Sequence, residues 1–355
     1  MAVHRPNGPA SVPNFGPQAC RSAYNPIVSP SGGPIRYFER PAPQSLRQPR
    51  AIVAFGGWVD AGSAGTGAVR FLISSLGAHK LADIDPEEFY SFTDTRPLTS
   101  VVGPGQRALY WPRGEFYAAS LPDDAGHDLV LFVAPEPNLK WRTFATLMLD
   151  VLQGVGASSL FGVGSIFGAV HHRAAVPLTG WATDPRLRET LERHQIGFTN
   201  YEGPTGFITV LLAEAHARGL PAAAIFAFTP NYIQGVPNPR TSHALLKAVA
   251  RVSGAPLRLD ELERNGRALV SQVDRLLAEQ PALREQVQRM LDLLKVAEPP
   301  AAGNEEHVGP AAGEPSPPEA KVELPSPQAV VHELEEFLKQ LRERDRGKSD
   351  SNGGP

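Results

Sequence analysis

The sequence has a single cysteine, Cys20, among 355 residues. One cysteine excludes an intrachain disulfide and any zinc site built from several cysteines. Long apolar runs are missing too. The longest, such as Ala222–Phe228, fall far short of the ~20 residues that a membrane-spanning helix needs. The N-terminal stretch Met1–Phe15 contains no apolar core of signal-peptide length. These absences predict a cytoplasmic protein without a membrane partner.

The sequence also lacks a large excess of positive or negative charge. The formal net charge is −3, which leaves no basic footprint for nucleic acid, so no nucleic-acid partner is expected. Residues 1–35 are rich in proline, glycine, serine and asparagine and show no apolar periodicity, which predicts a disordered N-terminal segment. Because Cys20 lies in that segment, we do not expect it to be catalytic.

The stretch Ala51–Gly67, AIVAFGGWVDAGSAGTG, is the most informative local pattern. Its first five apolar residues predict a strand buried on both faces. Gly56 and Gly57 then favour a tight turn, and Asp60 is a good N-cap for a following helix. A nucleotide site is the less favoured alternative, because the turn has no lysine and matches neither G-x-G-x-x-G nor G-x-x-x-x-G-K-[ST]. A purely structural turn or a contact surface is the favoured explanation of the glycines.

Apolar strands alternate with helical patterns along the rest of the chain, which predicts an α/β protein with a largely parallel sheet. Further buried strands are expected at 128–134, 158–163 and 222–228, with helices at 141–151, 186–194 and 208–217. Three more helices, at 242–252, 259–278 and 283–296, follow Pro239. Smaller elements are also predicted: an edge strand at 36–40, a helix starting at Asp85-Pro86, and a hairpin of 107–111 with 115–120.

The C-terminal part changes in composition. Residues 298–327 contain eight prolines and predict a linker. Residues 328–346 carry an apolar stripe and predict an amphipathic tail helix, and residues 347–355 are expected to be disordered. The main domain therefore spans 36–297.

Ligands of doubly wound sheets bind beyond the carboxyl ends of the strands, so the loops expected there define a candidate pocket. Its polar side chains suit acid–base or anion-binding work, but caps and turns explain them as well. The adjacent His171 and His172 lack a spaced third ligand, so no metal is predicted. Ser165 lies in G-x-G-S rather than G-x-S-x-G, so it is a weak nucleophile candidate. No catalytic residue and no cofactor is predicted. The candidate ligand-binding residues are Gly56, Gly57, Trp58, Asp60, Glu136, Trp141, His171, Arg173, Glu202, Gly203 and Thr205, with Thr205 also a candidate N-cap for the helix at 208–217.

Several short motifs occur together in a recognisable order. They are GGWVDAG (56–62), IDPEEFYSF (84–92), RP (96–97), WP (111–112), EPNLKWR (136–142), YEGPTG (201–206) and NPRTSHALL (238–246). Across about residues 36–297 the chain resembles the proteasome assembly chaperone family, second-member type, and especially its bacterial single-chain members.

The resemblance implies a three-layer α/β fold like that of nucleoside phosphorylases, with additional C-terminal helices. It also implies a non-enzymatic assembly chaperone or protein-interaction module, since the eukaryotic relatives pair and guide proteasome α-subunits. Self-association through the core and C-terminal helices, plausibly as a trimer, is the further implication; Trp58, Trp141 and Trp181 are candidate interface aromatics. The chain ends Asn352-Gly353-Gly354-Pro355 and departs from the hydrophobic–tyrosine–any-residue ending of docking tails. The alternative function is a small-molecule or nucleotide-binding enzyme that uses the strand-end pocket.

Overall fold

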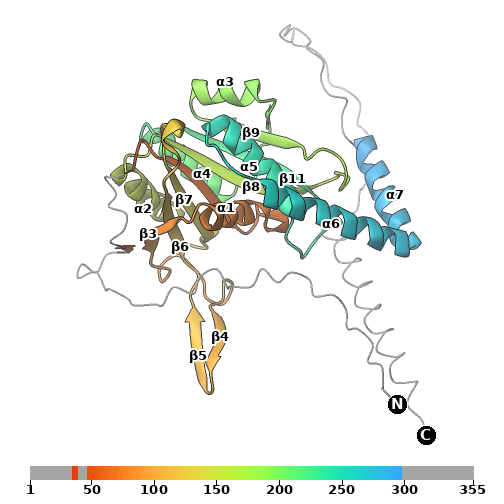
Figure 1. Cartoon of the computed structure of the whole chain (residues 1–355), viewed down its shortest axis with the longest axis horizontal. Coiled ribbons are helices and arrows are strands. Elements are labelled where there is room, and N and C mark those ends of the chain that lie inside the picture. Colours follow the sequence, from red (N-terminus) through yellow and green to blue (C-terminus); the bar gives the residue numbers. More distant parts are fainter. Residues whose placement is uncertain (1–33, 39–45, 298–355) are drawn as a thin grey trace, which may run out of the picture. The chain divides into compact units, whose positions relative to one another are not determined.

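The computed structural model describes residues 34–38 and 46–297, with side chains described up to residue 292 (Figure 1). The predicted N-terminal segment up to residue 33, the linker 298–327, the tail helix 328–346 and the segment 347–355 lie outside the described residues. Within them, a nine-stranded sheet has the order β1-β3-β6-β7-β2-β8-β11-β9-β10. Its strands are β1 (Ile35–Tyr37), β2 (Arg50–Gly56), β3 (His79–Ile84), β6 (Gly114–Ala119), β7 (Leu129–Pro135), β8 (Ser159–Gly168), β9 (Leu178–Ala182), β10 (Gly197–Phe198) and β11 (Ala222–Pro230).

The sheet is mixed, not largely parallel as the sequence predicts. The four central strands β7, β2, β8 and β11 run parallel to one another. On one side of these strands, β6 is antiparallel to β7 and β3 is antiparallel to β6. On the other side, β9 is antiparallel to β11. Only residues 120–128 join β6 to β7, and this is too short for the crossover of a dozen or more residues that a parallel pair needs.

Helices cover both faces of the sheet. Alternate residues of β2 point to opposite sides, so Val53 and Phe55 join one buried apolar cluster while Ile52 and Ala54 join the other. Helices α2 (Trp141–Gly154) and α4 (Phe207–Ala217) close the first cluster. Helices α1 (Ala64–Ser75), α3 (Pro185–Arg193) and α5 (Pro239–Ser253) close the second.

The predicted C-terminal helices are confirmed as α5, α6 (Asp260–Glu279) and α7 (Pro281–Ala297). Helix α6 packs closely on α5, because Gly266 leaves room for the backbone of Arg240: a Cβ at Gly266 would lie 2.9 Å from the Arg240 Cα. The described residues also include two 3-10 turns, η3 (Ala61–Ser63) and η4 (Asp123–Ala125). In the described part of the chain, no helix combines the length and the apolar character that a membrane crossing requires.

The predicted hairpin of 107–111 with 115–120 is wrong. β5 (Gln106–Tyr110) pairs instead with β4 (Leu98–Gly103), and β6 joins the main sheet (Figure 1). The turn is formed at Gly103-Pro104-Gly105, where Gly105 has a φ of +71° that favours glycine. Pro112 separates β5 from β6 and has no N–H to donate to a strand ladder.

The predicted helix at Asp85 is also wrong, and β3 before it was missed. The Asp85 carboxylate accepts a hydrogen bond from the Glu87 N–H at 3.0 Å, as a cap would, but only turns follow. Tertiary packing overrides the helix signal, because Phe89 and Tyr90 are buried in the core. The Phe89 carbonyl accepts hydrogen bonds from the N–H groups of Asn138 and Leu139, which fixes the segment against the loop after β7.

Candidate functional site

The loops after the four parallel strands meet at one edge of the sheet, as predicted. β2 ends at Gly56, β7 at Pro135, β8 at Gly168 and β11 at Pro230. This edge is where open α/β sheets place their ligands. The predicted site residues fall into two neighbourhoods there, one at the turn after β2 and one at the loop after β8.

Asp60 caps α1 with its side chain but is not the N-cap residue that the sequence predicts: Ser63 occupies that position, and Asp60 lies three residues earlier, before the η3 turn. Its Oδ1 accepts hydrogen bonds from the N–H groups of Gly65 at 2.8 Å and Thr66 at 3.1 Å, and its Oδ2 accepts one from the Thr66 hydroxyl. The side chain is nearly buried, and this burial raises the pKa of Asp60 while the three hydrogen bonds oppose the rise. The carboxylate therefore satisfies the otherwise unpaired amides of a helix N-terminus.

Ser165 is fully buried on β8 and donates its hydroxyl proton to the Ala61 carbonyl at 2.8 Å. Together with the backbone bridge between Asp60 and Ser165, this bond fixes the η3 turn on β8. The hydroxyl thus has a structural partner, which favours the structural interpretation of the G-x-G-S sequence.

Glu136 makes the equivalent contact on the other face of the sheet. Its Oε1 accepts a hydrogen bond from the Phe207 N–H at the start of α4 at 2.7 Å, and its own N–H donates to the Gly56 carbonyl at 2.6 Å. Gly57 has a φ of +145°, and a Cβ there would lie 3.1 Å from the Glu136 Cβ. The predicted N-cap Thr205 is therefore wrong: Gly206 is the N-cap residue, and the capping carboxylate comes from a distant loop.

The remaining candidates of this neighbourhood differ in exposure. Trp141 is half-buried, donates its indole N–H to the Pro137 carbonyl, and packs edge-on against Phe207 at 5.7 Å between ring centroids. Trp58 is 58% exposed. Glu202, Gly203 and Thr205 lie in the exposed loop before α4 and do not line the groove described next.

A groove of about 280 Å³ lies beside the η3 turn. Its exposed apolar side chains are Trp58, Phe167 at the end of β8, and Val236 in the loop after β11. We call these three side chains the groove rim. The groove is lined by Gly57, Trp58, Asp60, Ala61, Gly62, Ser63, Phe167, Gly235, Val236 and Pro237.

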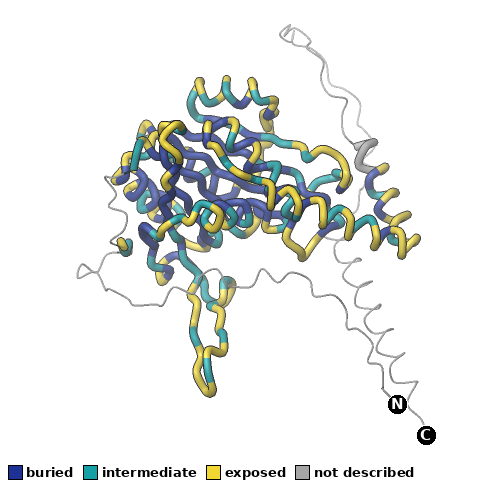
Figure 2. Tube along the Cα trace, viewed as in Figure 1, coloured by how far each residue is buried: buried dark blue, intermediate teal, exposed yellow. Residues whose placement is uncertain are grey.

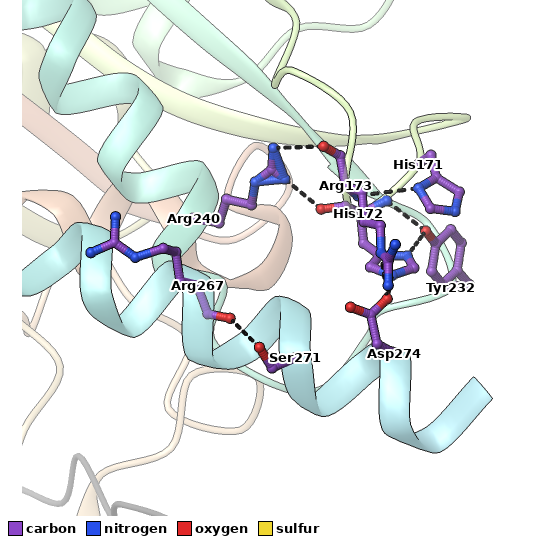
Figure 3. Close-up of polar contacts among 8 residues, drawn as sticks. All are labelled: His171, His172, Arg173, Tyr232, Arg240, Arg267, Ser271 and Asp274. Atoms are coloured by element: carbon purple, nitrogen blue, oxygen red, sulfur yellow. Dashed lines mark hydrogen bonds and ion pairs between the residues drawn. The ribbon is translucent and has the colours of Figure 1, made fainter. Parts of the chain in front are cut away.

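The second neighbourhood is a polar network around His172 (Figure 3). The Tyr232 hydroxyl lies 2.7 Å from both the backbone N and the Nδ1 of His172, and Nε2 lies 2.8 Å from Asp274 Oδ1. The hydroxyl oxygen accepts from the His172 N–H, so its proton is free to bond Nδ1, and Nε2–H then donates to Asp274. Every polar atom of the buried imidazole is satisfied in this arrangement.

Two arginines complete the network. Arg173 Nε donates to Asp274 Oδ1 at 2.7 Å, and this contact with the His172 bond lowers the pKa of Asp274 to about 2. Arg240 of α5 donates to the carbonyls of His172, Arg173 and Ala174, so it holds the backbone of the loop (Figure 3). Burial raises the pKa of Tyr232. The network therefore fastens the loop after β8 to α5 and α6.

The sequence reasoning missed Tyr232, Arg240 and Asp274. Asp274 lies 102 residues from its partner His172 on a helix with an ordinary surface pattern, so no local signal marks it. Within residues 34–38 and 46–297, no group of three or more His, Cys, Asp or Glu side chains is arranged to hold a metal ion.

The fold and the site define a mixed α/β protein in which carboxylates at the strand ends accept hydrogen bonds from the N-terminal N–H groups of helices. Residues 54–277 match the model of the PAC2 family, and the chain belongs to that family. None of the curated proteins matches it.

Solved structures support the assignment. A PAC2 family protein from Streptomyces avermitilis is 32% identical with a TM-score of 0.60, over 64% of this chain and 95% of that chain. A proteasome-assembly chaperone homologue from Mycobacterium tuberculosis is 31% identical with a TM-score of 0.61, over 67% and 99%. An archaeal proteasome activator from Pyrococcus furiosus, 19% identical with a TM-score of 0.54 over 68% and 97%, shares the fold.

Proposed function

We propose that the chain is a non-enzymatic assembly chaperone or protein-interaction module that acts on proteasome-type complexes. Similarity to a protein named as a proteasome-assembly chaperone homologue supports the link to proteasomes. The observation that carries the proposal is the contrast at the strand-end edge. Asp60 and Glu136 are engaged there in structural hydrogen bonds, while Trp58, Phe167 and Val236 offer large apolar side chains to solvent.

A general acid or base must reach the proton that it transfers. Asp60 accepts three hydrogen bonds from α1, and Glu136 accepts the first amide of α4. If either carboxylate took part in a reaction, a helix would lose the acceptor of its N-terminal amides. This favours a structural role for both.

The groove rim has the character of a protein contact. Trp58 and Phe167 are exposed aromatics beside a concave surface, and aromatic anchors next to a pocket dominate the energetics of many interfaces. We infer that a partner subunit inserts a side chain into the groove and packs on the rim.

Co-purification with the proteasome subunits of the same organism tests this proposal. The variant Trp58→Ala/Phe167→Ala should bind at least about tenfold more weakly, because each truncated anchor costs on the order of 1–2 kcal/mol. Leu276→Ala removes an exposed apolar side chain of α6 and is the matched control, with unchanged binding expected. Undiminished capture of proteasome subunits by the double variant, or no capture by the unmodified chain, contradicts the proposal.

One observation favours the alternative of a small-molecule or nucleotide site. The groove, at about 280 Å³, is close to the lower end of ligand-pocket volumes, and Gly57 and Asp60 line it. A thermal-shift screen with nucleotides, nucleosides and sugar phosphates is the test, because a ligand that binds only the folded state raises the melting temperature with concentration. No shift at millimolar ligand removes this alternative.

A further inference from the structure

The groove beside the η3 turn combines two aromatic side chains with one buried carboxylate. The strands of the sheet are buried, whereas exposed residues lie in the connecting loops and on the outer helices (Figure 2). Trp58 and Phe167 belong to this exposed set, at 58% and 44%. Asp60 is 9% exposed, and it is the only ionisable residue among the described residues that line the groove. The groove therefore presents aromatic rings at its rim and negative charge in its wall.

The Asp60 carboxylate has no cationic partner within the part of the chain that the structure describes. Its hydrogen-bond donors, which are the amides of Gly65 and Thr66 and the Thr66 hydroxyl, are all neutral. Burial raises the pKa of Asp60, and the hydrogen bonds and the more distant charge of Arg70 on α1 oppose this rise. A carboxylate offers about four acceptor positions. Oδ1 uses two and Oδ2 uses one, so one position on Oδ2 is left for a ligand.

Any occupant that fills the groove also removes water from this carboxylate. Burying an ionised carboxylate without a partner charge is costly, and an apolar occupant supplies neither a charge nor a hydrogen-bond donor. An anionic occupant is repelled by the same charge. A cation with N–H donors compensates for the lost hydration, and it is also attracted to the faces of Trp and Phe rings. The chemistry of the groove therefore selects a cationic side chain.

Arginine suits such a groove better than lysine. The guanidinium is planar, stacks on aromatic rings and is more weakly hydrated than an ammonium, so it loses less hydration on entering a partly buried site. The groove wall contains Gly57, Gly62 and Gly235, which have no side chain and leave room for a flat group. Arginine is also one of the residues that most often anchor protein interfaces.

We propose that the partner protein inserts an arginine side chain into the groove, where its guanidinium lies between Trp58 and Phe167 and donates a hydrogen bond to Asp60. This inference rests on the proposed function, because it names the chemistry that the partner presents to the groove rim. The amides of α1 occupy Oδ1, so a contact through Oδ2 leaves them in place. Asp60 thus caps α1 and receives the partner with the same carboxylate.

Small probes test the recognition without a partner protein. The methylamides of N-acetyl-arginine and N-acetyl-citrulline have nearly the same shape, but only the arginine probe is charged. Each probe is titrated into the isotope-labelled full chain, and the amide signals of Gly57 and Gly62 are followed by NMR. The citrulline probe should bind at least about tenfold more weakly than the arginine probe, because it forms neither an ion pair nor a cation–π contact. Equal affinities, or no saturable shift by the arginine probe in the millimolar range, overturn the proposal. An equal affinity for the corresponding lysine probe overturns the choice of arginine.

Two variants identify the site. Asp60→Asn keeps an acceptor for the α1 amides and removes the charge, so the affinity for the arginine probe should fall at least about tenfold. Trp58→Leu keeps an apolar side chain at an exposed position and removes the ring, so it should weaken binding without affecting the fold. Glu263→Gln removes a carboxylate from the surface of α6 and is the matched control, with unchanged affinity expected. Wild-type affinity in both Asp60→Asn and Trp58→Leu refutes the assignment of the site.

Capture of proteasome subunits separates a failure of this inference from a failure of the proposed function. The arginine probe should compete with the captured partner, and the citrulline probe at the same concentration should not. If Asp60→Asn captures the partner as well as wild type while Trp58→Ala/Phe167→Ala does not, the groove rim binds without an arginine, and only this inference is overturned. If wild type captures no subunit while the arginine probe binds through Asp60, the proposed function fails and the recognition of a guanidinium stands.

Discussion

Replacing Asp60 with alanine tests whether its carboxylate has a structural role or a functional one. Asp60 holds the first turn of α1 through Gly65 and Thr66. Losing an N-cap costs about 0.5–2 kcal/mol, and leaving buried donors unsatisfied costs about 1–3 kcal/mol for each group. Because burial raises the pKa of Asp60, keeping its charge buried costs free energy, and removing the carboxylate offsets part of the loss in stability. We expect Asp60→Ala to lower the free energy of unfolding by about 2–4 kcal/mol.

Urea unfolding of Asp60→Ala and Asp60→Asn is the assay. Asparagine keeps an acceptor for the Gly65 and Thr66 amides and carries no buried charge, so this variant should lose less than about 1 kcal/mol. Stability retained in Asp60→Ala, together with lost binding of a partner or ligand, would refute the structural role. Because the folded-state pKa is raised, the Asp60 carboxyl favours folding at low pH, and that contribution is lost as the pH rises above 3.8 through the folded-state value.

Three further predictions concern the same edge of the sheet. Asp274→Asn should destabilise the protein at neutral pH, because hydrogen bonds from Arg173 and His172 lower the pKa of Asp274 to about 2 and so stabilise its charged form in the folded state. The difference in stability from wild type should vanish as the pH falls from about 4 towards 2, and acid unfolding monitored by circular dichroism measures it. Glu136→Ala should cost about 1–2 kcal/mol in urea unfolding because the Phe207 N–H loses its acceptor, whereas Glu136→Gln should cost less than half as much; equal losses would contradict the capping role. Gly57→Ala should lower the free energy of unfolding by about 1–3 kcal/mol, because its φ of +145° strains any residue with a Cβ.

The parts of the fold that the sequence predicted correctly are those with a local signal. The apolar run of β2, the glycines after it and the capping side chain of Asp60 lie within one short stretch, and each acts on its near neighbours. The helices after Pro239 follow from regular apolar spacing. The convergence of the strand-end loops then follows from the geometry of parallel strands.

The predictions that were wrong concern features that are decided by residues far apart in the sequence. Glu136 caps a helix 71 residues away, so the nearer Thr205 looked like the natural cap. The helix signal at Asp85 is overridden by burial of Phe89, and the partner of β5 is decided by a Gly-Pro-Gly turn. The likeness to nucleoside phosphorylases and the trimer remain predictions. A native mass of three chains in light scattering would support the trimer, and a mass of one or two chains would contradict it.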